Sequence, residues 1–340
     1  TAFESSWQFD QRTQLLTQLD RIPTHWVLSP SGEKAAFVRD YNLWLKDLKT
    51  GHEKPLTNDG KEFYVYGSAV TAGGSDNWPI EDFRWSPDST RLVTSLIDSR
   101  DVSTGVPLVQ HVPTEGLRPS ILSPQRRLAL FDDKSVEEWQ LLSIDTETGQ
   151  ILPMNYEACP ISYPIYQGYF NAGRGWWDSG SRYVYCVYQE SDSTQTRLLK
   201  WDTDSGQVST VFEENLYSKG GYNAIIPATH LCPLLTPLPE TNELIWYSER
   251  SGCPHLYLID LTTGQVKNAI SSGDWVVRDI LHVDALRREL LIQTAGRAAP
   301  DRSPYYRDIC WINMDTGKLT AVISSNHDHV VFEDKNWASF

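Results

Sequence analysis

The feature that most constrains this chain is a short turn that recurs five times. In each copy a strand-like segment ends at Asp or Asn, a Thr or Ser stands three residues later, and a Gly follows at once. The turn glycines lie 98, 57, 58 and 53 residues apart, at Gly51, Gly149, Gly206, Gly264 and Gly317. Glycine supplies the positive φ of a tight hairpin, and Asx and Thr side chains hydrogen-bond to the turn backbone. A period of about 50 residues is typical of stacked supersecondary units.

A second turn alternates with the first and precedes another strand-like run. Its copies begin near Ser29, Ser86, Asp178, Leu238 and Asp284. Each repeat therefore contains four short strands joined by tight turns, which is the content of one antiparallel propeller blade. The sequence predicts an all-β fold, a β-propeller of four-stranded antiparallel blades. At about 50 residues per blade the chain has room for seven or eight blades.

Composition supports this fold and excludes some functions. The chain has 13 Trp, 16 Tyr and 10 Phe but only two Met, and its formal net charge is −14. An acidic chain is a poor partner for nucleic acid, because binding relies on Lys and Arg at the phosphates. The five Cys are widely spaced and predict neither a disulfide framework nor a zinc site. No cofactor, metal or membrane span is predicted.

The ends of the predicted domain follow from the same patterns. Residues 1–25 are expected to form a helical or extended lead-in, with a helix over Gln11 to Ile22, where three leucines share one face and Pro23 ends it. Residues 26–340 contain no low-complexity linker and are predicted to form one propeller domain.

The order of several segments resembles one family. The run Ala35 to Trp44, the segment Phe83 to Ser89, the Pro-containing stretch 106–119 and the segment His255 to Val277 are similar to the N-terminal propeller of the dipeptidyl-peptidase IV family of serine peptidases. The resemblance implies eight blades, and it leads us to expect a further blade segment after Phe340, so that the last blade here is incomplete. In that family a C-terminal α/β-hydrolase domain follows, with its nucleophile in a G-x-S-x-G motif. This sequence contains no such motif, so no catalytic residue is assigned.

The resemblance also implies a substrate anchor that is missing here. Family members hold the substrate ammonium with a Glu-Glu pair before the second blade, but the corresponding stretch 64–76 has no adjacent glutamates. Glu81 and Asp82 form the nearby acidic pair, although they lie too close to Trp85 to match the family pattern. A solvated loop pair is the default interpretation, and substrate binding by Glu81 and Asp82 is the functional alternative.

Two other segments invite a functional reading and favour a structural one. His327 and His329 flank Asp328 and would share one face of a strand, but zinc needs a third protein ligand and none is identifiable. A polar terminal strand is the expected structure. The run 173–177, Gly-Arg-Gly-Trp-Trp, has the glycines of a phosphate loop without a following helix, so it is predicted to be a blade-entry turn with Trp packing.

Three functional hypotheses follow. In the first, the chain is the non-catalytic propeller of a dipeptidyl-peptidase-IV-like serine peptidase, a funnel that gates and helps position peptide for the hydrolase domain. The partners are then that domain, the peptide substrate and a second copy in a homodimer. The family implies a periplasmic or secreted location, whereas the residues leave the cytoplasm open. The alternatives are a free-standing protein-interaction propeller and a glycan-binding or glycosidase-type propeller, which its many Trp residues would suit.

Overall fold

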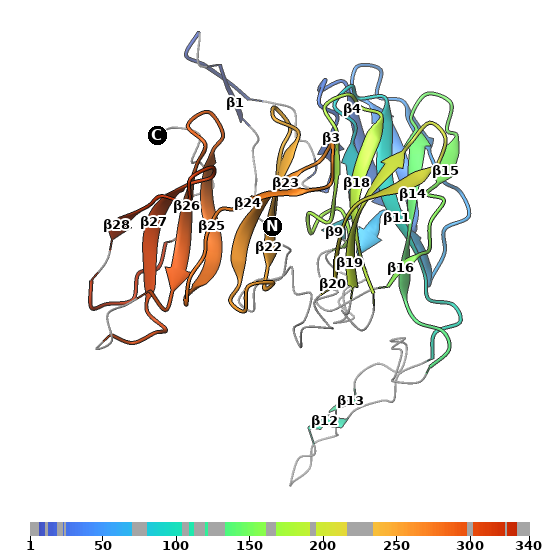
Figure 1. Cartoon of the computed structure of the whole chain (residues 1–340). Coiled ribbons are helices and arrows are strands. Elements are labelled where there is room, and N and C mark those ends of the chain that lie inside the picture. The colour runs from blue at the N-terminus through green and yellow to red at the C-terminus, as the bar shows by residue number, and fades with distance from the viewer. Residues whose placement is uncertain are drawn as a thin grey trace. The chain divides into compact units, whose positions relative to one another are not determined.

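The structure is a computed structural model in which strands are the only regular elements among the described residues (Figure 1). The described residues are 7–10, 13–18, 23, 25–69, 80–103, 109–111, 120–121, 133–160, 168–190, 195–215, 234–297, 302–323 and 325–331. The all-β prediction is therefore confirmed.

Five antiparallel sheets follow one another along the chain, each with four strands in sequence order. Blade 1 consists of β3 (Val27–Leu28), β4 (Lys34–Arg39), β5 (Asn42–Asp47) and β6 (Glu53–Pro55). Blade 2 consists of β10 (Phe83–Trp85), β11 (Arg91–Asp98), β14 (Glu138–Asp145) and β15 (Ile151–Pro153), with β7 (Tyr64–Tyr66) and β16 (Cys159–Pro160) added at its ends. Blade 3 consists of β17 (Gly175–Trp177), β18 (Tyr183–Gln189), β19 (Gln195–Asp202) and β20 (Val208–Asn215).

Blade 4 consists of β21 (Leu235–Leu238), β22 (Glu243–Ser248), β23 (His255–Asp260) and β24 (Val266–Ala269). Blade 5 consists of β25 (Val276–Asp284), β26 (Glu289–Ala295), β27 (Arg307–Asn313) and β28 (Leu319–Ile323). Three two-stranded pairs complete the described part: β1 (Trp7–Asp10) with β2 (Leu15–Gln18), β8 (Ser68–Ala69) with β9 (Ile80–Glu81), and β12 (Val109–His111) with β13 (Ser120–Ile121). The four-stranded blades are as predicted, and the total of seven or eight stays a prediction.

Blade 4 shows why the middle strands are apolar at every position. All six residues of β22 are buried, so the strand does not alternate between buried and exposed positions. Ile245 and Tyr247 join a core with blade 5, whereas Leu244 and Trp246 join a core with blade 3. Successive side chains of a strand point to opposite faces, and here both faces are covered by a neighbouring sheet.

The recurring turns join the third and fourth strands of each blade, as the sequence predicts. In all five, the side-chain Oδ1 of the Asp or Asn accepts the N–H two residues later. The glycine N–H donates to the backbone carbonyl of the same Asp or Asn, and the glycine φ lies between 67° and 77°. The second set of turns joins the first and second strands, and each contains one residue with positive φ. Both turns lie at the same end of a blade, which we call the turn end.

The predicted helix over Gln11 to Ile22 is wrong where the structure describes it. Leu15–Gln18 form β2, which pairs with β1, and Gln14 has a φ of 54° in the intervening turn. A helix of this length needs a surface to bury its apolar face, and Leu15 is 62% exposed. Pairing with β1 gives the backbone its hydrogen bonds without such a surface.

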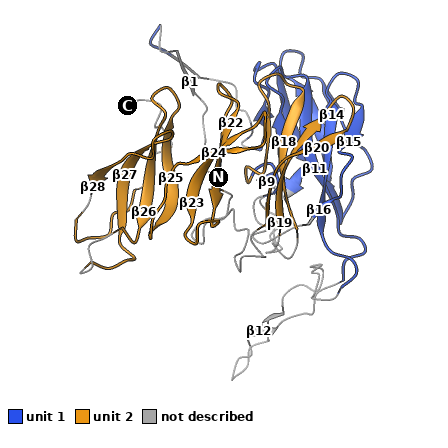
Figure 2. Ribbon diagram, in the orientation of Figure 1, with its two compact units in different colours: residues 1–161, 165–171 blue, residues 162–164, 172–340 orange. Residues whose placement is uncertain are grey.

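The chain divides into two compact units (Figure 2). The first contains residues 1–161 and 165–171, and therefore blades 1 and 2. The second contains residues 162–164 and 172–340, and therefore blades 3 to 5. A single propeller domain over residues 26–340, preceded by a lead-in over 1–25, stays a prediction.

Candidate functional site

The two candidate carboxylates lie at the start of blade 2 in very different surroundings. Glu81 is the last residue of β9 and pairs with Ser68, while Asp82 stands between β9 and β10 and donates its N–H to the carbonyl of Gly67. Neighbouring residues of an extended chain project in opposite directions, so the two side chains do not converge on one point.

Asp82 is fully buried and surrounded by donors from the chain itself. Its carboxylate accepts three consecutive backbone N–H groups, from Tyr169 at 2.9 Å, Phe170 at 2.6 Å and Asn171 at 3.0 Å. The hydroxyl of Ser95 donates a fourth hydrogen bond. Burial raises the pKa of Asp82, and these hydrogen bonds oppose that rise because they favour the ionised form. The reading of this residue as part of a solvated pair is wrong.

The backbone around Asp82 is shaped to admit the carboxylate. Gly168 has a φ of 72°, and a Cβ at that position would lie 2.6 Å from the Asp82 carboxylate. Arg84 donates from Nη2 to the carbonyl of Phe170 at 3.1 Å, on the same short segment. Asp82 and Arg84 thus fix residues 168–171 against the first strand of blade 2.

Glu81 keeps part of its surface, and burial of the rest raises the pKa of its carboxyl group. A hydrogen bond with the backbone of Glu81 itself opposes this rise, and so does nearby His25. Of the two candidates, Glu81 is therefore the one that can reach a ligand, whereas Asp82 has a structural task. Substrate binding by the pair stays a prediction.

The histidine segment is held by blade 5 but is not a strand. Residues 325–331 follow β28 without regular structure, so the expected polar terminal strand is wrong for these residues. Both imidazoles lie near one hydroxyl, because Ser325 Oγ is 3.4 Å from Nδ1 of His327 and 3.1 Å from Nε2 of His329. Asp328 instead pairs with Arg307, at 2.5 Å. In the described part of the chain, no three His, Cys, Asp or Glu side chains group as metal ligands would.

The Gly-Arg-Gly-Trp-Trp run is the entry to blade 3, as predicted. Gly175–Trp177 form β17, the first strand of the blade, and Arg174 immediately before it is buried. The Trp176 ring stacks on Tyr185 of β18 with centroids 5.8 Å apart. Trp176 also packs against the apolar core that blades 3 and 4 share.

Comparison with known proteins identifies the family. Residues 2–116 and 168–337 match the model of the dipeptidyl peptidase IV N-terminal region. The chain belongs to this family. It is 36% identical to a probable dipeptidyl-aminopeptidase B of Emericella nidulans and 23% identical to the protein of the same name in Aspergillus oryzae. The alignments cover 95% and 94% of this chain.

Solved structures of dipeptidyl peptidase IV type share the fold. The chain superposes on Porphyromonas gingivalis dipeptidyl peptidase 4 with a TM-score of 0.62, and on a putative dipeptidyl aminopeptidase IV from Bacteroides ovatus with 0.63. Each pair is 17% identical, and each alignment covers 94% of this chain. It covers 42% and 43% of the solved chains, and the chain spans about a third (36%) of the length of the two curated relatives. Within the described residues, no helix has the length and apolar character needed to cross a membrane.

Sequence reasoning missed the partners of Asp82 for a definite reason. The three N–H groups that it accepts lie 87 to 89 residues further along the chain. Backbone donors carry no side-chain signature, so only Gly168 could have signalled the close approach.

Proposed function

We propose that this chain is the non-catalytic propeller part of a dipeptidyl-peptidase-like protein, which gates peptide access to a C-terminal α/β-hydrolase domain and helps to position the peptide there. One observation carries the proposal: the chain matches the N-terminal region of the family over residues 2–116 and 168–337, yet its alignments with two curated relatives cover only 36% of their length. The sequence contains no G-x-S-x-G motif, so the nucleophile has to come from outside these residues.

Within this proposal, Glu81 contributes to binding the peptide's terminal ammonium. Its carboxylate is partly exposed, and among the described residues it forms no salt bridge. Asp82 keeps its position by holding residues 168–171. A single carboxylate should grip an ammonium less tightly than the family's pair, because each charge-assisted hydrogen bond adds separately to affinity.

A chimera tests the proposal. Residues 1–340 replace the matching region of the Emericella nidulans relative, whose remaining part supplies the hydrolase. We expect the chimera to cleave an Xaa-Pro p-nitroanilide and to spare a folded protein with the same N-terminal dipeptide, while the isolated chain cleaves neither. Peptidase activity in the isolated chain, or a folded chimera that cuts folded and unfolded substrates equally, would contradict the proposal.

A pair of variants tests the role of Glu81 in the chimera. Glu81→Gln should raise KM for the Xaa-Pro substrate by about tenfold with little change in kcat, because it removes binding that is equal in ground and transition states. Glu33→Gln, at an exposed position of a blade 1 turn, is the matched control and should leave KM unchanged. Equal KM values for both variants would remove Glu81 from the site without affecting the gating proposal.

A further inference from the structure

Two junctions between neighbouring blades can be compared position by position at the turn end. In each, the first residue of a second strand lies opposite the Asp of its own recurring turn: Lys34 opposite Asp47 in blade 1, and Glu243 opposite Asp260 in blade 4. The next blade contributes the residue two positions after its turn Asp or Asn, which is Glu147 in blade 2 and Asp315 in blade 5.

Two more positions complete the comparison. The third residue after the turn glycine is lysine in both earlier blades, Lys54 in blade 1 and Lys267 in blade 4. The residue with positive φ in the next blade's first turn is Ser89 in blade 2 and Arg288 in blade 5, and both side chains reach the preceding blade. The two junctions thus share their backbone plan and differ in their charges.

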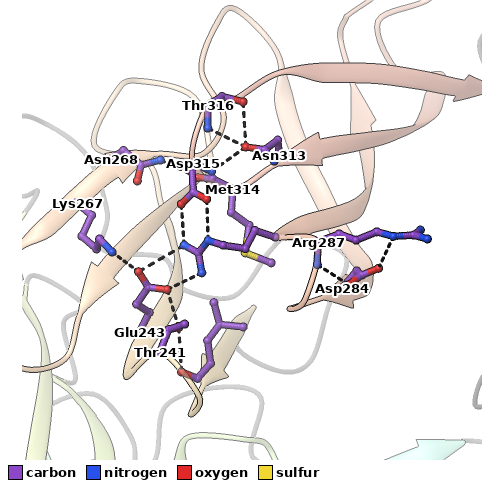
Figure 3. A network of polar contacts seen from close by, with 12 residues as sticks. Thr241, Glu243, Lys267, Asn268, Asp284, Arg287, Asn313, Met314, Asp315 and Thr316 are labelled. Carbon is purple, nitrogen blue, oxygen red and sulfur yellow. Dashed lines mark hydrogen bonds and ion pairs between the residues drawn. The ribbon is translucent and has the colours of Figure 1, made fainter.

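The junction between blades 4 and 5 is closed by a balanced ionic network (Figure 3). Glu243 is 3% exposed and pairs with Lys267 and, at 2.8 Å, with Arg288. Arg288 also binds Asp315 through two nitrogen atoms, each at 2.7 Å. Two cations thus face two carboxylates, and the guanidinium group fills the space between the sheets.

The junction between blades 1 and 2 has an opening at the same place. Ser89 stands at the position of Arg288 and accepts the backbone N–H of Ser31 instead of an ion pair, and a surface cavity of about 350 Å³ lies at this junction. It is lined by Lys34, Leu45, Asp47, Thr50, His52, Lys54, Thr146 and Glu147. Lys34 stands at the strand position that Glu243 has in blade 4. The junction of blades 1 and 2 therefore has a cation where the junction of blades 4 and 5 has a carboxylate.

The two lysine ammonium groups keep donors that no described residue accepts. Lys34 Nζ pairs with Glu147 and lies 3.4 Å from Thr146 Oγ1, so one of its three N–H groups is left. Lys54 Nζ donates to the carbonyl of Glu147 at 3.0 Å, so two are left. Asp47 does not compete for them through Oδ1, which accepts three hydrogen bonds within its own turn. The partner of Lys34 lies at the surface, since the side chain of Glu147 is 72% exposed while that of Lys34 is 20% exposed.

We propose that this cavity binds a small oxyanion between Lys34 and Lys54, at the place that the Glu243 carboxylate fills in the junction of blades 4 and 5. The ligand is a phosphate or carboxylate group, since both present oxygens at the spacing of ammonium donors. The site lies at the turn end of blades 1 and 2 and involves neither Glu81 nor Asp82. It is therefore independent of the proposed peptide-gating function.

Titration of the purified chain with inorganic phosphate and, separately, with acetate tests the proposal, with chloride at equal ionic strength as the reference. We expect saturable binding in calorimetry and a rise in melting temperature that grows with ligand concentration. A response to phosphate alone supports a phosphate-bearing ligand, and an equal response to acetate supports a carboxylate. No saturable response to either anion would overturn the proposal.

Variants assign the binding to the cavity. Lys54→Gln should weaken binding by about tenfold, the value of one charge-assisted contact. Lys49→Gln, an exposed lysine in the same turn, is the matched control and should leave affinity unchanged. An equal loss in both variants would show a diffuse charge effect and overturn the proposal.

A double variant tests whether the anion binds inside the cavity. Lys34→Glu with Ser89→Arg copies the charges of the closed junction, and position 89 already has the positive φ that Arg288 adopts. We expect loss of anion binding with the melting temperature in chloride retained. Undiminished binding in a folded double variant would place the anion elsewhere and overturn the proposal.

Discussion

At the scale of single residues, the buried carboxylate of Asp82 holds the backbone of residues 169–171 in the first unit. It takes the place of water for three consecutive backbone N–H groups. The segment 168–171 has no regular hydrogen-bonding ladder of its own, so its conformation depends on Asp82 and on Arg84, which donates to the carbonyl of Phe170.

Replacing Asp82 by Asn should therefore strongly destabilise the fold. The amide has one acceptor oxygen instead of two and turns an NH2 group toward backbone donors, so we expect the free energy of unfolding to fall by about 3 kcal/mol. Ser95→Ala should cost about 1 kcal/mol, because it removes one donor and leaves the carboxylate bound. Asp101→Asn, at an exposed position, is the control. Urea unfolding measures all three, and an Asp82→Asn protein as stable as the parent would refute the structural role.

The Arg307–Asp328 pair makes a pH-dependent contribution. The hydrogen bonds that Arg307 donates to Asp328 lower the pKa of the Asp328 carboxyl group from its usual 3.8 to about 2. A lowered pKa means that the pair stabilises the fold above about pH 4 and that this contribution is lost as the pH falls from about 4 to about 2. The ¹³C chemical shift of the Asp328 carboxyl group should titrate near 2. In Arg307→Gln the midpoint should move up toward 3.8; no movement would exclude Arg307 as the cause.

At the scale of elements, the recurring turn is one local design placed in two surroundings. Gly51 and Gly264 have nearly the same φ, 73° and 69°. A Cβ on Gly51 would meet nothing within 4 Å, whereas one on Gly264 would lie 1.8 Å from the carbonyl oxygen of Val211 in blade 3. The turn of blade 4 is thus also a contact between blades.

These two glycines form a matched pair for mutation. Gly51→Ala should cost about 1 kcal/mol, the price of a left-handed conformation for an L-residue. Gly264→Ala should cost about 2 kcal/mol more, because the turn must also move away from Val211. Chemical denaturation gives both values. Equal losses would mean that blade 4 can shift its turn freely.

At this scale, the sequence predicts those elements whose structure is determined by residues close together along the chain. The turns around Gly51 and Gly317 were predictable because the acceptor, the donors and the positive φ lie within five residues. The segment Gln11 to Ile22 was mispredicted because the leucine spacing suits a helix, whereas the pairing with β1 decides the structure. The structural role of Asp82 is not predictable from the sequence, because its hydrogen-bond donors come from a distant segment of the chain.

At the scale of the whole molecule, the second unit depends on contacts between sheets. Blades 4 and 5 share one apolar core and the ionic network around Arg288. Arg288 holds a positive φ of 55°, which is unfavourable for a side chain of this size. Its ion pairs with Glu243 and Asp315 offset that strain.

Replacing Arg288 should lower the stability of the fold much more than replacing an exposed arginine does. Arg288→Gln leaves the buried Glu243 with Lys267 and Thr241 alone, and we expect a loss of about 3 kcal/mol. Arg287→Gln, whose side chain is 78% exposed and whose pair with Asp284 spans 3.7 Å, should change stability by less than about 0.5 kcal/mol. Thermal unfolding of both variants at low and high salt is the measurement. Similar losses would show that the network is only a surface feature.

The two ends of a blade differ in how freely their sequence can grow. At one end, hydrogen bonds made inside each hairpin fix its length, so a single added residue would break the Asx–Gly spacing. At the other end of blade 2, the connection between β11 and β14 already extends over residues 99–137 without disturbing the register of the two strands. A reporter peptide or a new recognition loop is therefore best grafted between second and third strands.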